Sequence, residues 1–147
     1  MSDEPRYYLP PIVRPGFAPG SLEAPYWEAT RREELVVQRC SGCRTFQWGP
    51  EWICHACQSF DLDFEPVRPS GRIYSWERAW HPVHPDLAVA CPYLVVLVEL
   101  DDAPGVRMVG NLLGDPLQAV EIGAPVGAEF EHHDDYTLVQ WRATGAH

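Results

Sequence analysis

The stretch that decides the fold is CSGCRTFQWGPEWICHACQS, residues 40–59, which contains four of the five cysteines of this 147-residue chain. Their spacing is Cys-x2-Cys-x10-Cys-x2-Cys. Each Cys-x-x-Cys turn directs two thiolates at one ion, and the two turns together supply the four tetrahedral ligands of a structural zinc site. Because four thiolates leave no position for water or substrate, the sequence predicts one structural zinc ion per chain. The expected ligands are Cys40, Cys43, Cys54 and Cys57.

Two alternatives stay open at this metal site. An iron ion of the rubredoxin type uses the same ligands and geometry, so the spacing does not exclude iron. His55 lies inside the second turn and could replace a cysteine, although four cysteines make this unnecessary. The fifth cysteine, Cys91, precedes Pro92 at the start of an apolar run, which is more typical of a buried small side chain than of a nucleophile.

The composition limits the classes of function. The formal net charge is −10, from 21 acidic and 11 basic residues, and all of the basic residues are arginine. So acidic a chain is poorly suited to neutralising phosphates, and we expect no nucleic-acid partner. No apolar run approaches the roughly 18 residues that span a bilayer, and the start resembles no signal peptide, so we expect no membrane association and a cytoplasmic location. Thiols stay reduced there, which favours metal ligation over disulfides.

The first third of the chain divides into three segments. Residues 1–20 hold five prolines and predict an extended arm, whose apolar side chains, Tyr7 and Tyr8 among them, either lie in a groove or belong to a floppy terminus. Residues 21–35 predict a helix, with Ser21 as its cap and Pro25 in its first turn. Residues 35–40 predict a strand that enters the first cysteine turn.

The second half of the chain is rich in strand patterns. Apolar and β-branched runs predict five strands, with a short turn of helix at 117–120 after Asp115-Pro116. This is the order of a five-stranded OB-fold barrel. A glycine inside the third strand, Gly110, predicts a bulge or a close backbone approach. The five predicted strands are 72–80, 92–100, 106–113, 124–133 and 136–143.

The sequence therefore predicts a mainly β protein, in which an N-terminal helix and a rubredoxin-like zinc ribbon precede the barrel. The expected domains are an arm over 1–20, helix plus ribbon over 21–66, and barrel over 67–147. Trp48 and Trp52 flank Pro50 between the cysteine turns, where a ribbon offers little core, so they indicate either a partner interface or packing against the helix.

Two histidine-containing stretches are candidates for acid–base chemistry. His81 and His84 are each followed by proline, which favours a loop between the first two barrel strands over a metal-binding helix. EHHDDY, residues 131–136, places histidines beside carboxylates, but it also has the composition of a polar hairpin turn, which we prefer.

Several segments in this order resemble a known family, the zinc-ribbon plus OB-fold proteins described as acyl-CoA-associated. The segments cover about 24–130, and their order is more specific than any single piece. Arg44 stands where the family usually has glycine after the first cysteine turn. The segments are APYWEATRREELVVQRCSGC, CHACQS, SGRIYSW, CPYLVVLVELDDAPGVRMVGNL and EIGAPVGAEF.

The resemblance implies an accessory subunit that lacks its own catalytic residues. Members resemble the small partners of thiolase-like large subunits, which cleave acyl-CoA thioesters by thiolysis or by retro-aldol reaction in aromatic or steroid side-chain degradation. The expected assembly is a heterotetramer of two small and two large subunits. The ribbon and arm would dock on the large subunit, and Arg39 and Arg44 would meet CoA phosphates, to which guanidinium geometry is suited.

Two other classes of function are weighed against this one. Zinc ribbons and OB-folds both occur in single-stranded nucleic-acid binders, where aromatic side chains stack on bases, but the net charge opposes this. A stand-alone acyl-CoA enzyme would need His81, His84 or the His132–Asp135 cluster as catalytic groups.

Overall fold

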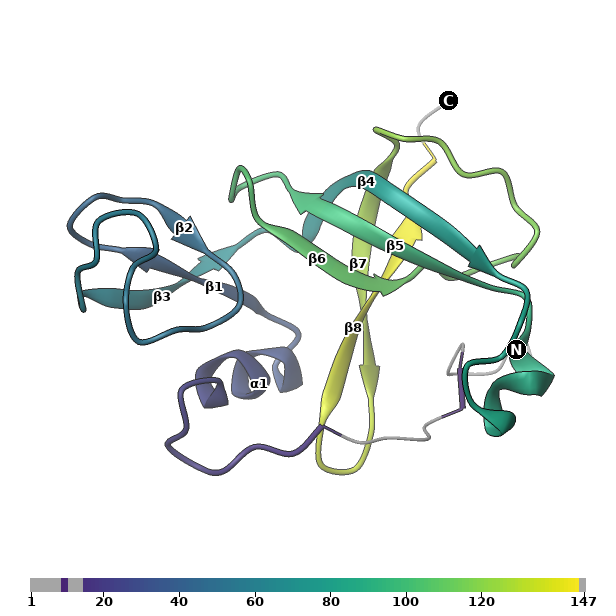
Figure 1. The fold of residues 1–147 in the computed structure, drawn as a ribbon, viewed down its shortest axis with the longest axis horizontal. Coiled ribbons are helices and arrows are strands. Elements are labelled where there is room, and N and C mark those ends of the chain that lie inside the picture. The colour runs from purple at the N-terminus through teal and green to yellow at the C-terminus, as the bar shows by residue number, and fades with distance from the viewer. Residues whose placement is uncertain (1–8, 11–14, 146–147) are drawn as a thin grey trace.

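The chain folds into a three-stranded ribbon sheet and a five-stranded barrel, and one short helix packs against both (Figure 1). The computed structural model describes residues 9–10 and 15–145. The predictions for Tyr7, Tyr8 and most of the arm therefore lie outside the described residues. The mainly β class and the order of helix, ribbon and OB-fold are as predicted. No helix within the described parts of the chain has the length and apolar character needed to cross a membrane.

Helix α1 (Ala24–Arg31) is shorter than predicted. It begins after Glu23, with proline in its first turn, and the predicted cap is wrong because the Ser21 hydroxyl is buried without a hydrogen bond among the described residues. It ends where Glu33 adopts a left-handed φ of 59°, a conformation that stops helix propagation. The buried face of the helix carries Tyr26 and Ala29, which turn toward the barrel and ribbon.

The ribbon sheet has the order β2-β1-β3. Strand β1 (Leu35–Cys40) is the predicted strand, and it pairs with the short β2 (Phe46–Gln47) and along its whole length with β3 (Leu62–Val67). The sequence analysis missed β3 because its proline and acidic residues break the usual alternation. Pro66 is tolerated because β3 is an edge strand, where a missing N–H costs no ladder bond.

The barrel contains all five predicted strands, in the sheet order β6-β5-β4-β7-β8. A parallel bridge between Leu112 and Trp141 joins the third strand to the fifth and closes the sheet, as an OB-fold requires. The pairing of β4 with β5 shifts by one residue at Tyr74, which bends β4 around the barrel. The strands are β4 (Ser70–Ala79), β5 (Tyr93–Leu100), β6 (Arg107–Asn111), β7 (Pro125–His132) and β8 (Thr137–Ala143).

Two connections differ from the prediction. The expected turn of helix at 117–120 is wrong: the segment is a turn and loop, and the Arg78 guanidinium holds it by donating to the carbonyls of Pro116 (2.9 Å) and Gln118 (2.6 Å). The segment 80–92 is predicted as a loop, but it contains the short 3₁₀ helix η1 (Pro85–Ala90). Proline at the first position of η1 is tolerated, because its missing N–H would have no partner within the helix.

One hydrophobic core runs through the barrel and into the ribbon. Its largest fully buried side chain is Trp141, and the helix adds Tyr26 while β1 adds Leu35 and Val37. The ribbon and the barrel are therefore packed on each other through α1 and β1. This packing fixes the position of the cysteine turns relative to the barrel.

Candidate functional site

The four ribbon cysteines converge at one point. Their Sγ atoms all lie within 4.8 Å of one another, and the pairs Cys40–Cys57 and Cys43–Cys54 are each 3.6 Å apart. A disulfide would need about 2.05 Å. Zinc–sulfur bonds of about 2.3 Å in a tetrahedron place sulfur atoms about 3.8 Å apart, so these distances fit a metal ion and not a disulfide.

The two cysteine turns share one backbone geometry. Arg44 and Gln58 each follow the second cysteine of a turn, and both have a left-handed φ of 64°. The Arg44 N–H donates to the Cys40 carbonyl at 2.8 Å, and the Gln58 N–H donates to the Cys54 carbonyl at 2.9 Å. Glycine adopts this left-handed conformation more easily than any other residue. Arg44 thus adopts the conformation of the glycine that the resemblance led us to expect.

Backbone N–H groups and a hydroxyl donate hydrogen bonds to the sulfur atoms of Cys40, Cys43 and Cys54. The Cys40 Sγ accepts from the Cys43 N–H at 3.5 Å, and the Cys54 Sγ accepts from the Ala56 N–H at 3.4 Å. Hydrogen bonds from the Thr45 hydroxyl and N–H lower the pKa of Cys43 to about 6. Because the thiolate is the form that binds a metal, the lowered pKa of Cys43 favours ligation by this residue at neutral pH.

Two buried glutamines brace the loop between the cysteine turns. Gln38 exchanges two hydrogen bonds with the backbone of Glu51, at 2.9 and 3.1 Å. Gln47 donates to the Ile53 carbonyl at 3.1 Å, and its Oε1 lies 2.8 Å from both the N–H and the ring Nδ1 of His55. The His55 ring therefore bonds Gln47 and is not part of the cysteine cluster. Sequence analysis missed both glutamines, because nothing local marks a buried amide.

The two arginines proposed for CoA share one carboxylate. Arg39 and Arg44 lie 3.3 and 3.2 Å from the two carboxylate oxygens of Glu65. The Arg39 guanidinium also lies 4.3 Å from the centre of the Phe46 ring. The structure thus brings both arginines together on one side of the ribbon, where an intrachain partner balances part of their charge.

The ribbon tryptophans have different environments. Trp48 is half-buried and meets Tyr26 of α1 edge to face, with ring centres 4.9 Å apart. Trp52 is 70% exposed, and Phe60 beside the second cysteine turn is 78% exposed. These two rings line a groove of about 280 Å³ that we call the ribbon groove. Pro50 is half-buried in the same loop. The other apolar residues of the ribbon groove are Leu22, Pro25, Leu62 and Phe64.

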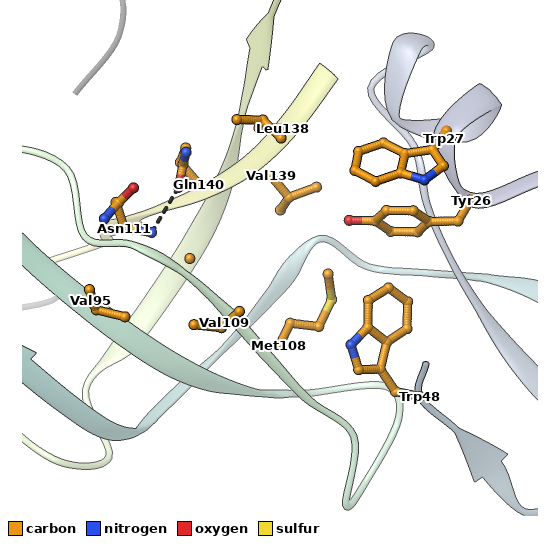
Figure 2. Close-up of a pocket in the computed structure, with 11 residues that line it drawn as sticks. Tyr26, Trp27, Trp48, Val95, Met108, Val109, Asn111, Leu138, Val139 and Gln140 are labelled. Carbon is orange, nitrogen blue, oxygen red and sulfur yellow. Dashed lines mark hydrogen bonds between the residues drawn. The ribbon is translucent and has the colours of Figure 1, made fainter. Parts of the chain in front are cut away.

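A second hollow lies between α1, the Trp48 loop and the barrel strands β6 and β8 (Figure 2). We call it the junction cavity, and its volume is about 420 Å³. Tyr26, Trp27 and Trp48 form its aromatic side, and strands β6 and β8 form the opposite side. Sequence analysis did not find it, because the three elements are far apart in the chain.

The two histidine-containing stretches form the loop and the hairpin turn that the sequence predicts. His81 and His84 are exposed, and the His84 ring accepts from the Asp86 N–H at 3.1 Å, which begins η1. EHHDDY forms the predicted hairpin turn between β7 and β8. There the ring of His133 lies 2.7 Å from the nearly buried carboxylate of Glu131 and stacks on Tyr136.

Comparison with family descriptions identifies both halves of the chain. Residues 27–63 match the family described as ChsH2, rubredoxin-like zinc ribbon domain, and residues 64–131 match ChsH2, C-terminal OB-fold domain. The chain therefore belongs to this zinc-ribbon and OB-fold family, which confirms the resemblance seen in the sequence. The rubredoxin-like ribbon and its four clustered cysteines together support a zinc site.

Solved structures agree with this assignment. The chain is similar to one in a structure described as the Ltp2-ChsH2(DUF35) aldolase, with a TM-score of 0.76 and 36% sequence identity over 90% of this chain and 100% of that chain. A DUF35-family protein of unknown function from Sulfolobus solfataricus has a TM-score of 0.62 at 11% identity, over 84% of this chain and 86% of that one, and shows the same fold.

Two curated relatives are named as subunits of hydratases. A probable enoyl-CoA hydratase alpha subunit of Thermomonospora curvata is 41% identical over 134 residues, which is 90% of this chain and 41% of the relative. The 3-oxo-4,17-pregnadiene-20-carboxyl-CoA hydratase alpha subunit of Mycobacterium tuberculosis is 28% identical over 116 residues, 79% of this chain and 36% of the relative. The chain thus spans about two fifths of the length of these relatives.

Proposed function

We propose that this chain is a non-catalytic accessory subunit that assembles with a thiolase-like large subunit acting on acyl-CoA thioesters. One observation carries the proposal: this chain is similar to a chain in a structure described as the Ltp2-ChsH2(DUF35) aldolase, and the similarity covers the whole of that second chain. The names of the two curated relatives also associate this type of domain with CoA esters. The expected complex contains two small and two large subunits.

We further propose that Cys40, Cys43, Cys54 and Cys57 hold one structural zinc ion. The separations of their sulfur atoms fit a tetrahedral ion, and the four thiolates fill all four ligand positions, so none is left for a reacting molecule. The ion would stabilise the ribbon and thereby the surface that the ribbon presents. Rubredoxin-type iron would occupy the same ligands, and metal analysis distinguishes the two.

The proposed docking surface is the ribbon groove, together with Pro50 and the N-terminal arm that carries Tyr7 and Tyr8. Two large aromatic side chains, Trp52 and Phe60, are exposed there beside a concave apolar surface. Aromatic residues of this kind are enriched in the centres of protein interfaces. Trp48 contributes less to this surface, because half of its ring already packs on α1.

Arg39 and Arg44 are proposed contacts for the phosphates of CoA within the complex. Both guanidinium groups retain exposed area, and one carboxylate, Glu65, does not neutralise two positive charges. If they bind CoA, changing both to alanine weakens acyl-CoA binding by the complex. Unchanged affinity in the double variant contradicts this role.

Native mass spectrometry of the tagged chain, purified from its own cells, tests the assembly and the metal together. The expected result is a complex of two small and two large chains, with a mass increment of one zinc ion for each small chain. Recovery of a zinc-loaded monomer without a large partner would contradict the accessory role. Iron in place of zinc would correct the metal and leave the assembly proposal intact.

A further inference from the structure

The free edge of strand β3 has the features of a binding site for an extended protein segment (Figure 1). We propose that the large subunit adds a strand to this edge, and that basic and apolar side chains alternate along the added strand. The inference rests on the proposed function, because the partner is the large subunit. It goes further by stating how that partner binds, since the ribbon groove supplies only one face of the site.

The pairing of β1 with β3 determines which backbone groups of β3 are free. The Ser41 N–H donates to the Asp61 carbonyl at 2.9 Å, so these two residues form a hydrogen-bonded pair at the end of the ladder. Such pairs recur at every second residue of an antiparallel ladder, so Asp63 and Glu65 also direct their backbone groups toward β1. The residues whose backbone groups point away from β1 are Leu62, Phe64 and Pro66.

These outward groups have few partners within the described part of the chain. The Leu62 N–H donates to the Phe60 carbonyl at 3.0 Å, and Pro66 has no N–H. No described residue bonds the Phe64 N–H or any of the three outward carbonyl groups. The edge therefore presents one donor and three acceptors in a row. An extended segment satisfies such a row by pairing with it as a further strand.

The side chains on one face of β3 suit an apolar partner. Successive side chains of a strand point to opposite faces, so Leu62 and Phe64 share a face. Both line the ribbon groove, where the rings of Trp52 and Phe60 are 70% and 78% exposed. Every second side chain of an added strand would lie beside this apolar surface.

The other face of β3 favours a basic side chain on the partner. Asp63 is exposed there and forms no ion pair with a described residue, whereas Glu65 already has two arginine partners. The three outward carbonyl oxygens carry partial negative charge beside the Asp63 carboxylate. A strand with a positive side chain at this position would complement both.

A second copy of this chain suits the edge less well. Two β3 strands paired antiparallel about Phe64 would place Asp63 of each copy opposite Glu65 of the other. Like charges directly opposite each other destabilise a strand pair. The net charge of −10 also opposes the close approach of two copies. Charged side chains on an edge strand prevent self-pairing in this way, yet they leave a partner of opposite charge free to bind.

Hydrogen exchange of the complex, purified from its own cells through a tag on this chain, tests the proposal. Mass spectrometry that resolves single amides should show fast exchange at Phe64 in the isolated chain, between protected amides at Asp63 and Glu65. In the complex, we expect exchange at Phe64 to slow by about tenfold or more, because this amide then bonds the large subunit.

A pair of variants at Phe64 tests the backbone contact. Phe64→Pro removes the outward N–H without removing a bond to β1, as Pro66 does two residues later. Phe64→Val is the matched control, because it also loses the ring but keeps the N–H. We expect Phe64→Pro to bind the large subunit about tenfold or more weakly than Phe64→Val, since it loses a hydrogen bond and its ring obstructs the added strand. Equal zinc content and far-UV circular dichroism verify that both variants fold.

A charge variant tests the other face and leaves the backbone unchanged. Asp63→Lys should weaken association by about threefold to tenfold. Raising the ionic strength should weaken the unmodified complex more than this variant, because salt screens the attraction that the variant lacks. Glu121→Lys is the matched control, since Glu121 is exposed in a barrel loop and does not line the ribbon groove. It should bind as the unmodified chain does.

Three results would overturn this proposal and leave the accessory role intact. The first is a complex in which the Phe64 amide exchanges as fast as in the isolated chain. The second is equal affinity of the Phe64→Pro and Phe64→Val variants for the large subunit. The third is a dimer of the isolated chain that Phe64→Pro abolishes, which would assign the edge to a second copy. Recovery of no large subunit at all would overturn the accessory role and this inference together.

Discussion

Gly110 lies where the barrel has no room for a side chain. A Cβ atom built there would lie 2.8 Å from the Cδ1 and 3.0 Å from the Nε1 of the Trp141 indole, and 3.0 Å from the Val139 carbonyl oxygen. Trp141 is fully buried and cannot move aside without displacing the core. This glycine is therefore what allows β6 and β8 to approach and close the barrel.

We expect Gly110→Ala to destabilise the fold by about 1–3 kcal/mol, the usual cost of forcing extra atoms into a packed core. The midpoint of urea unfolding, followed by far-UV circular dichroism, measures the change. Gly16→Ala is the control, because nothing lies near that position and its φ is ordinary. Equal stability of the two variants would mean that the contact between β6 and Trp141 is loose.

The sequence indicated that Gly110 was special, but not why. A glycine inside an apolar strand pattern predicts a close approach. Its neighbour Trp141 is 31 positions away, and only barrel closure brings the two together. In the same way, the sequence left packing on the helix or a partner interface open for Trp48 and Trp52, and the fold packs Trp48 on α1 and leaves Trp52 exposed.

At the scale of elements, the ribbon is the part of the molecule that we expect to depend on metal. The strands β1, β2 and β3 form a small sheet, and the segment between β2 and β3 has no regular structure besides the second cysteine turn. Such a segment buries little apolar surface. A structural zinc site contributes about 10–16 kcal/mol of apparent binding free energy, enough to hold it.

Removal of the metal should therefore unfold the ribbon and leave the barrel folded. Amide hydrogen exchange, measured before and after treatment with a strong chelator, should show lost protection over 40–62 and retained protection in β4 to β8. Cys54→Ser should give the same pattern without a chelator, because Cys54 is a buried member of the cluster. A ribbon that keeps its protection without metal contradicts the proposed structural role.

The connection between ribbon and barrel should be sensitive to acid. Arg68 lies between β3 and β4, and it donates through its side chain and its N–H to Asp102 in the β5–β6 turn, at 2.7 to 2.9 Å. These bonds lower the pKa of Asp102. A lowered folded-state pKa means that the stabilisation is complete above the unfolded value, about 3.9, and is lost as the pH falls below it.

Asp102→Asn should therefore unfold at lower urea concentration than the unmodified chain at pH 6, and the difference should shrink as the pH falls below about 3.9. Urea midpoints measured at several pH values test this. The control is Asp86→Asn, in the exposed loop at η1, which should show no comparable trend. A difference that stays constant down to pH 3 contradicts the ion pair as its cause.

At the scale of the whole molecule, the ribbon groove and the junction cavity lie on different surfaces of one packed unit. The ribbon groove combines residues of the chain around α1 with residues of the ribbon, whereas the cavity combines α1 and the ribbon with the barrel. Because the groove and the cavity share no lining residue, a variant of the groove tests the proposed docking of a large subunit without altering the cavity.

We expect Trp52→Ala combined with Phe60→Ala to weaken association with the large subunit by about thirtyfold or more, since an interface hot spot contributes about 2 kcal/mol. Both rings are mostly exposed, so the melting temperature of the isolated chain should not change. Val89→Ala, at a residue that is 90% exposed in η1, is the control. Retention of full affinity in the double variant would place the interface elsewhere.

The sequence by itself determined the cysteine turns, the five barrel strands and their OB-fold order. These depend on local spacing and on the period of apolar residues, which are legible along the chain. Only the tertiary structure decided the length of α1, the pairing of β3 with β1, the separate environments of Trp48 and Trp52, and the junction cavity. Each of these depends on contacts between residues distant in sequence, where packing and pairing outweigh local preference.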